Sequence, residues 1–198
     1  MERVGMKIRV LVTWSVVAMV MAVNGVSHAR EGKWFVSGYV AQATENSLNH
    51  MVRFDVDLID YYLACVAVGK EFFVYKDKFN LELELQVAEH WGHQNYEEVN
   101  AVFVFRWLKF PWDNYLDTSM AFGEGLSYAF SDSELEAIRH EDTTRFLNYL
   151  KLEWGFSLPD VPDWVLFLQV YHRSGVFGTF DGVSGASNLI GVGLKYRF

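Results

Sequence analysis

The chain has 198 residues, of which 51% are hydrophobic and 17% aromatic, and it carries a formal net charge of −8 at pH 7. This acidic balance excludes binding to nucleic acid through a broad basic face, because phosphate recognition requires clustered Lys and Arg. The single cysteine, Cys65, excludes a disulfide within the chain.

The first 29 residues have the pattern of a secretory signal peptide. Arg3, Lys7 and Arg9 precede an apolar run at 10–23, and Ser-His-Ala at 27–29 matches a small-x-small cleavage site. The apolar run of about 14 residues is shorter than the roughly 20 that a membrane-spanning helix needs, so a retained anchor is the less favoured alternative. We therefore expect residues 1–29 to be removed and residues 30–198 to form one domain, more acidic still without the basic leader.

The remaining chain alternates between apolar and polar residues again and again, which is the pattern of half-buried β-strands. In the segment FNLELELQV, for example, Leu83 and Leu85 point to one face while Glu82 and Glu84 point to the other. The second segment is ambiguous, because YYLACVAVG is apolar on both faces. The stretch at 131–144 holds at most one helical turn and is read more simply as a polar loop. The alternation predicts eight strands, near 34–43, 59–71, 78–90, 97–109, 118–131, 145–158, 163–175 and 187–198.

Two architectures suit eight amphipathic strands: a soluble lipocalin-type barrel with its apolar face inward, and an outer-membrane barrel with its apolar face toward lipid. The apolar faces are rich in Leu, Phe, Trp and Tyr, and the opposite faces carry both acids and bases that can pair inside a narrow barrel. The chain also ends on Phe198 after an alternating strand, which resembles the signal read by the barrel-assembly machinery of bacterial outer membranes. We therefore predict an all-β, eight-stranded antiparallel transmembrane β-barrel with a filled lumen, located in the bacterial outer membrane.

The lengths of the connections orient this barrel. The short turns, near 75–77, 111–114 and 159–162, follow the second, fourth and sixth strands, whereas the connections near 44–58, 132–144 and 176–186 are longer. Short turns are periplasmic and long loops are external in such barrels. Trp107, Trp154 and Trp164 fall near the short turns and are predicted to form the aromatic girdle at that interface.

Strand seven ends in a histidine and a serine that share the parity of its apolar face. His172 and Ser174 continue the stripe formed by Leu166 and Leu168, so we expect both at the outer end of the membrane-facing surface. A polar pair in that position is costly unless it has a function. An imidazole beside a hydroxyl can deprotonate it, which gives a nucleophile for ester cleavage. The alternative is that both residues merely lie in the headgroup region.

Three stretches, YHRSGVFG at 171–178, GVGLKYRF at 191–198 and residues 110–130, resemble the PagL-type lipid A 3-O-deacylases, also called outer-membrane acyloxyacyl hydrolases. These are eight-stranded barrels with a His-x-Ser pair near the outer end of strand seven. The resemblance implies that His172 is the general base and Ser174 the nucleophile. The implied reaction is hydrolysis of the acyl ester at the 3-position of lipid A in lipopolysaccharide, with no cofactor.

The family comparison also assigns positions that differ here. Asn188 stands where family members carry a Glu that orients the histidine, and an amide can hold a tautomer without offsetting an imidazolium charge. Gly175 follows Ser174 where the family has an Asn, so only a backbone N–H is available there for the oxyanion. Asp181 and Glu124 are further candidates for the acidic partner, and Asn148, with outward parity beside strand seven, is a candidate assisting residue.

The sequence offers little evidence for a metal site. His90 and His93 have a spacing that binds metal on a helix, but they lie near a strand end, so a solvated outer loop is expected and no metal site is predicted. Three functions therefore remain at this stage. They are a lipid A esterase, a catalytically inactive structural or surface-interaction outer-membrane barrel, and a soluble lipocalin-like binder in the periplasm.

Overall fold

The computed structural model describes residues 32–51, 53, 55–139, 144–176, 178–180, 182–183 and 186–198. The predicted signal peptide and Asp181 lie outside these residues. Contacts within the chain separate residues 31–198 as one compact unit, which is described here by itself.

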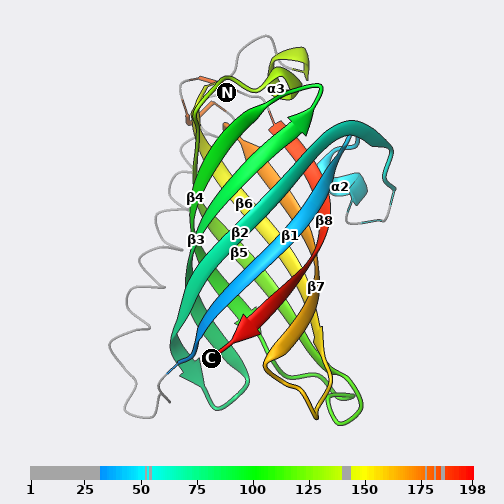
Figure 1. Ribbon diagram of the computed structural model, residues 1–198, viewed down its shortest axis with the longest axis vertical. Coiled ribbons are helices and arrows are strands. Elements are labelled where there is room, and N and C mark those ends of the chain that lie inside the picture. The colour runs from blue at the N-terminus through cyan, green and yellow to red at the C-terminus, as the bar shows by residue number, and fades with distance from the viewer. Residues whose placement is uncertain are drawn as a thin grey trace, which may run out of the picture. The chain divides into compact units, whose positions relative to one another are not determined.

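The unit is a closed barrel in which every strand pairs with its sequence neighbour and the first strand pairs with the last (Figure 1). All eight pairings are antiparallel. Trp34 and Phe198 exchange two backbone hydrogen bonds of 3.0 and 2.8 Å, so both ends of the barrel sequence lie at the same rim. The predicted fold class is thus confirmed, with strands β1 (Trp34–Thr44), β2 (Leu58–Tyr75), β3 (Phe79–Gly92), β4 (Tyr96–Trp107), β5 (Asp117–Ala129), β6 (Phe146–Ser157), β7 (Trp164–Ser174) and β8 (Ala186–Arg197).

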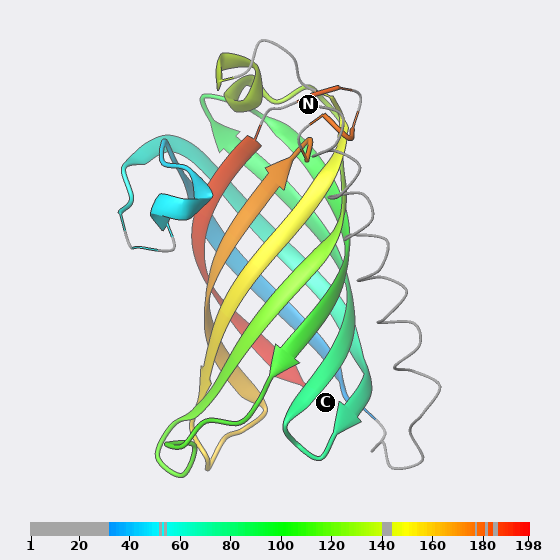
Figure 2. The ribbon, with the colours of Figure 1, turned by 180° about the vertical axis from the view of Figure 1, so that it is seen from behind.

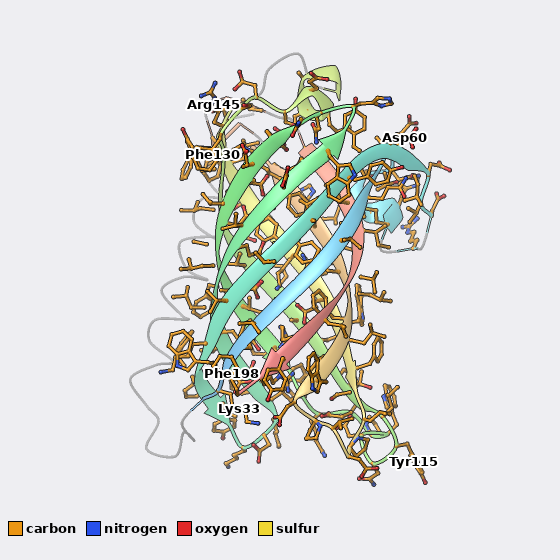
Figure 3. All side chains as sticks on the ribbon, viewed as in Figure 1. Lys33, Asp60, Tyr115, Phe130, Arg145 and Phe198 are labelled. Atoms are coloured by element: carbon orange, nitrogen blue, oxygen red, sulfur yellow. The ribbon has the colours of Figure 1, made fainter. Side chains whose placement is uncertain are left out.

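The outer surface of the barrel is apolar. Leu83, Leu85 and Val87 on β3 are 53–55% exposed, whereas Glu82 and Glu84, which alternate with them, are at most 1% exposed. Figure 3 shows side chains projecting outward along both sides of the wall in this view. A continuous exposed apolar belt of this kind suits hydrocarbon and not water, so this surface is the membrane-facing one. None of the helices in the described part of the chain has the length and apolar character needed to cross a bilayer.

The lumen is filled by charged side chains that pair with one another. Arg106 contacts Glu82 and Glu153, each at 2.7 Å, and Lys151 contacts Glu84 at 2.8 Å. Lys195 adds a contact of 3.2 Å to Glu153. Buried charges require such partners, and the period-two alternation delivers both signs to the interior. An apolar cluster shares the lumen, with Tyr39, Leu63, Val102, Tyr149 and Phe167 among its members.

The two ends of the barrel differ as predicted. Trp107 and Trp164 lie at the short-turn end, and the Trp164 ring packs on Tyr196 with centroids 4.8 Å apart. Figure 3 shows Lys33, Tyr115 and Phe198 at this end, with Asp60, Phe130 and Arg145 at the opposite end.

Two connections and one strand differ from the sequence-based expectation. The segment read as a polar loop contains helix α3 (Glu134–Arg139), because Leu135 joins the lumen cluster and Glu136 is fully buried at the outer mouth. The β1–β2 connection contains the short helix α2 (Leu48–Met51), with Met51 buried, outside the wall beside β8 (Figure 2). Strand β2 also continues to Tyr75, four residues beyond the predicted end. Helices this short have no detectable periodicity, and tertiary contacts stabilise them.

The lumen network predicts the effect of removing its central cation. In Arg106→Leu, the buried carboxylates of Glu82 and Glu153 lose the cation that lies nearest to both, so we expect the free energy of unfolding to fall by about 3–5 kcal/mol. Urea-dependent unfolding of the refolded barrel in detergent or lipid vesicles measures this change. The outward control Leu85→Met is expected to change stability by less than about 1.5 kcal/mol. Equal stability of Arg106→Leu and the native chain would contradict the network's structural role.

Candidate active site

The outer end of β7 carries His172 and Ser174 on the membrane-facing side of the wall. Both side chains are partly buried, while Tyr171 and Arg173, with the opposite parity, are fully buried in the lumen. Leu166 and Leu168, exposed at about half of their surface, continue the same outward stripe toward the short-turn end. The structure therefore places the pair on the predicted face and at the predicted end.

Asn188 is the residue that contacts the His172 ring. It lies directly across from His172 in the β7–β8 pairing, and its Oδ1 is 2.6 Å from the His172 Nδ1. The Asn188 Nδ2 donates to the main-chain carbonyl of Asn46 at 3.0 Å. Because a carbonyl can only accept, the NH₂ group of Asn188 must face Asn46 and its oxygen must face the imidazole. It follows that Nδ1 of neutral His172 carries the proton and Nε2 carries the lone pair.

The Asn46 carbonyl that orients this amide is itself held in place. Asn46 Oδ1 accepts a hydrogen bond of 2.6 Å from the Asp57 N–H, and Glu45 N–H donates to the Asp57 carbonyl at 3.0 Å. These two bonds join the start of the β1–β2 connection to its end. The sequence contains no signal for this contact, because Asn46 and Asn188 are 142 residues apart.

Ser174 is the last residue of β7, and the backbone changes direction immediately after it. A Cβ on Gly175 would lie 2.0 Å from the Val183 carbonyl oxygen, so no larger residue fits there. Val176 has a φ of 46°, a left-handed conformation that is unfavourable for a β-branched side chain. The Phe180 N–H closes the turn on the Gly175 carbonyl at 3.2 Å. Backbone strain of this kind is concentrated at functional sites.

Arg173, between the two candidate residues, anchors β7 from inside the barrel. Its guanidinium donates to both Glu136 carboxylate oxygens of α3 at 2.6 and 2.7 Å, and to Ser127 of β5 at 2.9 Å. It also donates to the Arg145 carbonyl at 2.7 Å. The backbone that carries His172 and Ser174 is therefore tied to β5, to α3 and to the start of β6.

His172 and Ser174 lie two residues apart on the outward face of β7. Residues i and i+2 on a strand have Cβ atoms about 6–7 Å apart, within reach of a rotamer change. The Nδ1 hydrogen bond to Asn188 leaves Nε2 as the nitrogen of the neutral His172 ring that can accept a proton. Catalytic hydrogen bonds are often long before substrate binds.

The remaining candidates occupy other positions. Glu124 lies in the same row of the sheet as His172, with Leu150 between them, and it interacts with its diagonal neighbour Asn148 instead. Asp181 lies outside the described residues. Of the residues predicted to orient His172, Asn188 is therefore the one that contacts its ring in the described part of the chain.

His90 and His93 do not form a pair. His90 is buried in the lumen with its Nε2 3.3 Å from Glu98, so the expected solvated position is wrong for it. Its inward parity on β3 and a buried carboxylate explain the difference. His93 is exposed and packs edge-on against Tyr61. In the part of the chain that the structure describes, no cluster of His, Cys, Asp and Glu has the arrangement of a metal site.

Comparison with known proteins identifies the fold alone. No family model matches the sequence, and no curated protein matches it. Among solved structures, the outer membrane enzyme PagL superposes with a TM-score of 0.56 at 9% identity, covering 82% of this chain and 98% of that one. Neisserial surface protein A superposes with a TM-score of 0.52 at 11% identity, covering 85% of this chain and all of that one. An enzyme and a surface protein thus share this outer-membrane barrel fold.

The hydrogen bonds around Asn188 predict an unusual histidine tautomer. We expect ¹⁵N NMR of the histidine-labelled barrel to show His172 protonated at Nδ1, with its signal assigned by the loss in His172→Gln. In Asn188→Leu the ring loses its acceptor, so the Nε2-protonated form, which is favoured for a free imidazole, is expected. Gln42→Leu, which removes another outward amide, serves as the control and leaves the spectrum of His172 unchanged. An Nε2–H signal in the native chain would refute this arrangement.

Proposed function

We propose that this chain is an outer-membrane esterase that removes the 3-O-linked acyl chain from lipid A of lipopolysaccharide. One observation carries the proposal. An imidazole whose Nδ1–H is held by Asn188 lies two residues from a serine, on the membrane-facing surface at the outer end of the barrel. The likeness to PagL at 9% identity supports the fold that this activity requires.

The position of the pair selects the class of substrate. The side chains face lipid rather than the lumen, so the scissile bond must belong to a molecule of the bilayer. They lie at the outer end, where the sugars of an outer-leaflet glycolipid meet its acyl chains. Lipid A carries ester bonds at this depth, and hydrolysis of an ester by Ser and His needs no cofactor.

The geometry supports a two-step mechanism. Nε2 of His172 takes the proton of Ser174 as its Oγ attacks the ester carbonyl carbon, which forms a tetrahedral oxyanion. When the intermediate collapses, the C–O bond to the sugar breaks and the protonated imidazole returns the proton to the departing sugar oxygen. Water, deprotonated by the same Nε2, then attacks the acyl-serine, and Ser174 leaves with the proton. The fatty acid and the 3-hydroxyl of the sugar are released.

A second function is favoured by the neutrality of Asn188. An amide stabilises the imidazolium of the transition state less than a carboxylate does. The alternative is therefore a catalytically inactive structural or surface-interaction barrel, and Neisserial surface protein A shows that the fold also occurs in a surface protein.

Lipid A from cells expressing the full chain separates these functions. Mass spectrometry is expected to show loss of one 3-linked hydroxyacyl chain, and none in Ser174→Ala or His172→Ala. His93→Ala and Ser131→Ala, which change exposed residues at the same end, are expected to retain activity. Intact lipid A in cells that contain the folded native barrel would support the inactive alternative.

The charge of the His172 partner predicts a gain of function. In Asn188→Glu a carboxylate replaces the amide next to Nδ1, so the imidazolium of the transition state is stabilised and kcat is expected to rise by about tenfold or more. Asn188→Leu, which has no acceptor, is expected to lower kcat instead. Initial rates on purified lipopolysaccharide in mixed micelles measure both. A folded Asn188→Glu barrel slower than the native chain would show that the amide does more than accept a hydrogen bond.

A further inference from the structure

A band of polar side chains crosses four strands on the membrane-facing surface. It runs from Glu124 on β5 through Asn148 on β6 and the His172–Ser174 pair on β7 to Asn188 on β8. The proposed mechanism uses the β7 and β8 members of this band and leaves the other two without a role. Polar groups in this environment are costly and are usually functional.

We propose that the Asn148 side-chain amide donates a hydrogen bond to the oxyanion formed at Ser174, and that the Glu124 carboxylate holds this amide in position. This inference rests on the proposed esterase function and adds a catalytic residue to it.

The register of the sheet places Asn148 beside the nucleophile. Asn148 and Ser174 are direct partners in the β6–β7 pairing. Side chains in such a pair have Cβ atoms about 4.5–5.5 Å apart, so the end of an Asn side chain reaches the region around the Ser174 Oγ.

The surroundings of Asn148 indicate a fixed side chain. It is only 9% exposed, whereas Phe146 and Leu126, on the same face and beside it, are 44% and 45% exposed. Glu124 is its diagonal neighbour across the β5–β6 pairing, and the Glu124 carboxyl interacts with the Asn148 side chain. A carboxylate accepts hydrogen bonds, so we infer that the NH₂ group of Asn148 is the end of the amide that faces Glu124.

The chemistry of the amide fits an oxyanion donor. Its nitrogen carries two N–H bonds, and one directed to Glu124 leaves the second for the developing negative charge. Gly175 supplies a backbone N–H next to Ser174 but no side chain, so Asn148 provides the second donor that oxyanion holes commonly have. Asn148 neither gains nor loses a proton. Its hydrogen bond strengthens as the carbonyl oxygen becomes negative and weakens when the carbonyl re-forms.

The test compares Asn148→Leu and Asn148→Asp with the native full-length barrel on purified lipopolysaccharide. Loss of one oxyanion donor lowers kcat by about 10²–10³-fold with little change in KM, and we expect this for both variants. Leu places an apolar side chain toward lipid, so the barrel should remain folded, as heat-modifiable gel mobility reports. Asp keeps the size of Asn and removes the N–H.

Two further variants check specificity. Gln42→Leu removes an outward amide that donates to the Ile59 carbonyl on β2, and it is expected to leave kcat unchanged. Glu124→Gln is expected to lower kcat less than Asn148→Leu does, and to have no further effect when added to it, because both changes act on one donor.

The outcomes separate this inference from the function on which it rests. If the native barrel hydrolyses lipid A and both folded Asn148 variants keep kcat within about twofold, the inference is overturned and the esterase stands. If the variants raise KM alone, Asn148 binds substrate and the inference is again overturned. An inactive native barrel would overturn both.

Discussion

The register of the closed barrel is the constraint on which the site depends. Side chains alternate strictly along a strand, and each residue faces a defined partner on both neighbours. A shift of one residue would turn His172 and Ser174 into the lumen and Arg173 toward lipid. The observed register instead brings Asn188 opposite His172 and Asn148 opposite Ser174, on the one surface that an outer-leaflet lipid reaches.

The ion pairs in the lumen maintain that register. Buried charges in a narrow lumen are tolerated only when each has a partner, and a slipped strand would leave several without one. Near the outer mouth a buried ion pair also supports the candidate site, because Arg173 of β7 contacts Glu136 of α3. The short helix therefore holds the strand end that carries both candidate catalytic residues.

On the outside of the wall, the site uses amides where hydrolases more often use a carboxylate. The Asn46 carbonyl, Asn188 and His172 form a neutral chain of hydrogen bonds that defines a tautomer without adding charge at the lipid boundary. A neutral chain is less costly to desolvate than a carboxylate, and it stabilises an imidazolium less. The neutral partner thus favours a stable membrane-facing surface.

The sequence by itself determined the barrel class, the number of strands, the faces that meet lipid and lumen, and the outward parity of His172 and Ser174. These features follow from a local period of two and from turn lengths. The tertiary structure decided which side chain contacts the histidine, that Asn148 lies between Glu124 and Ser174, and that the 131–144 segment holds a helix. It also decided the role of Asn46, which no pattern indicated. Such contacts join residues far apart in the chain through strand register and loop packing, and a local pattern carries no information about either.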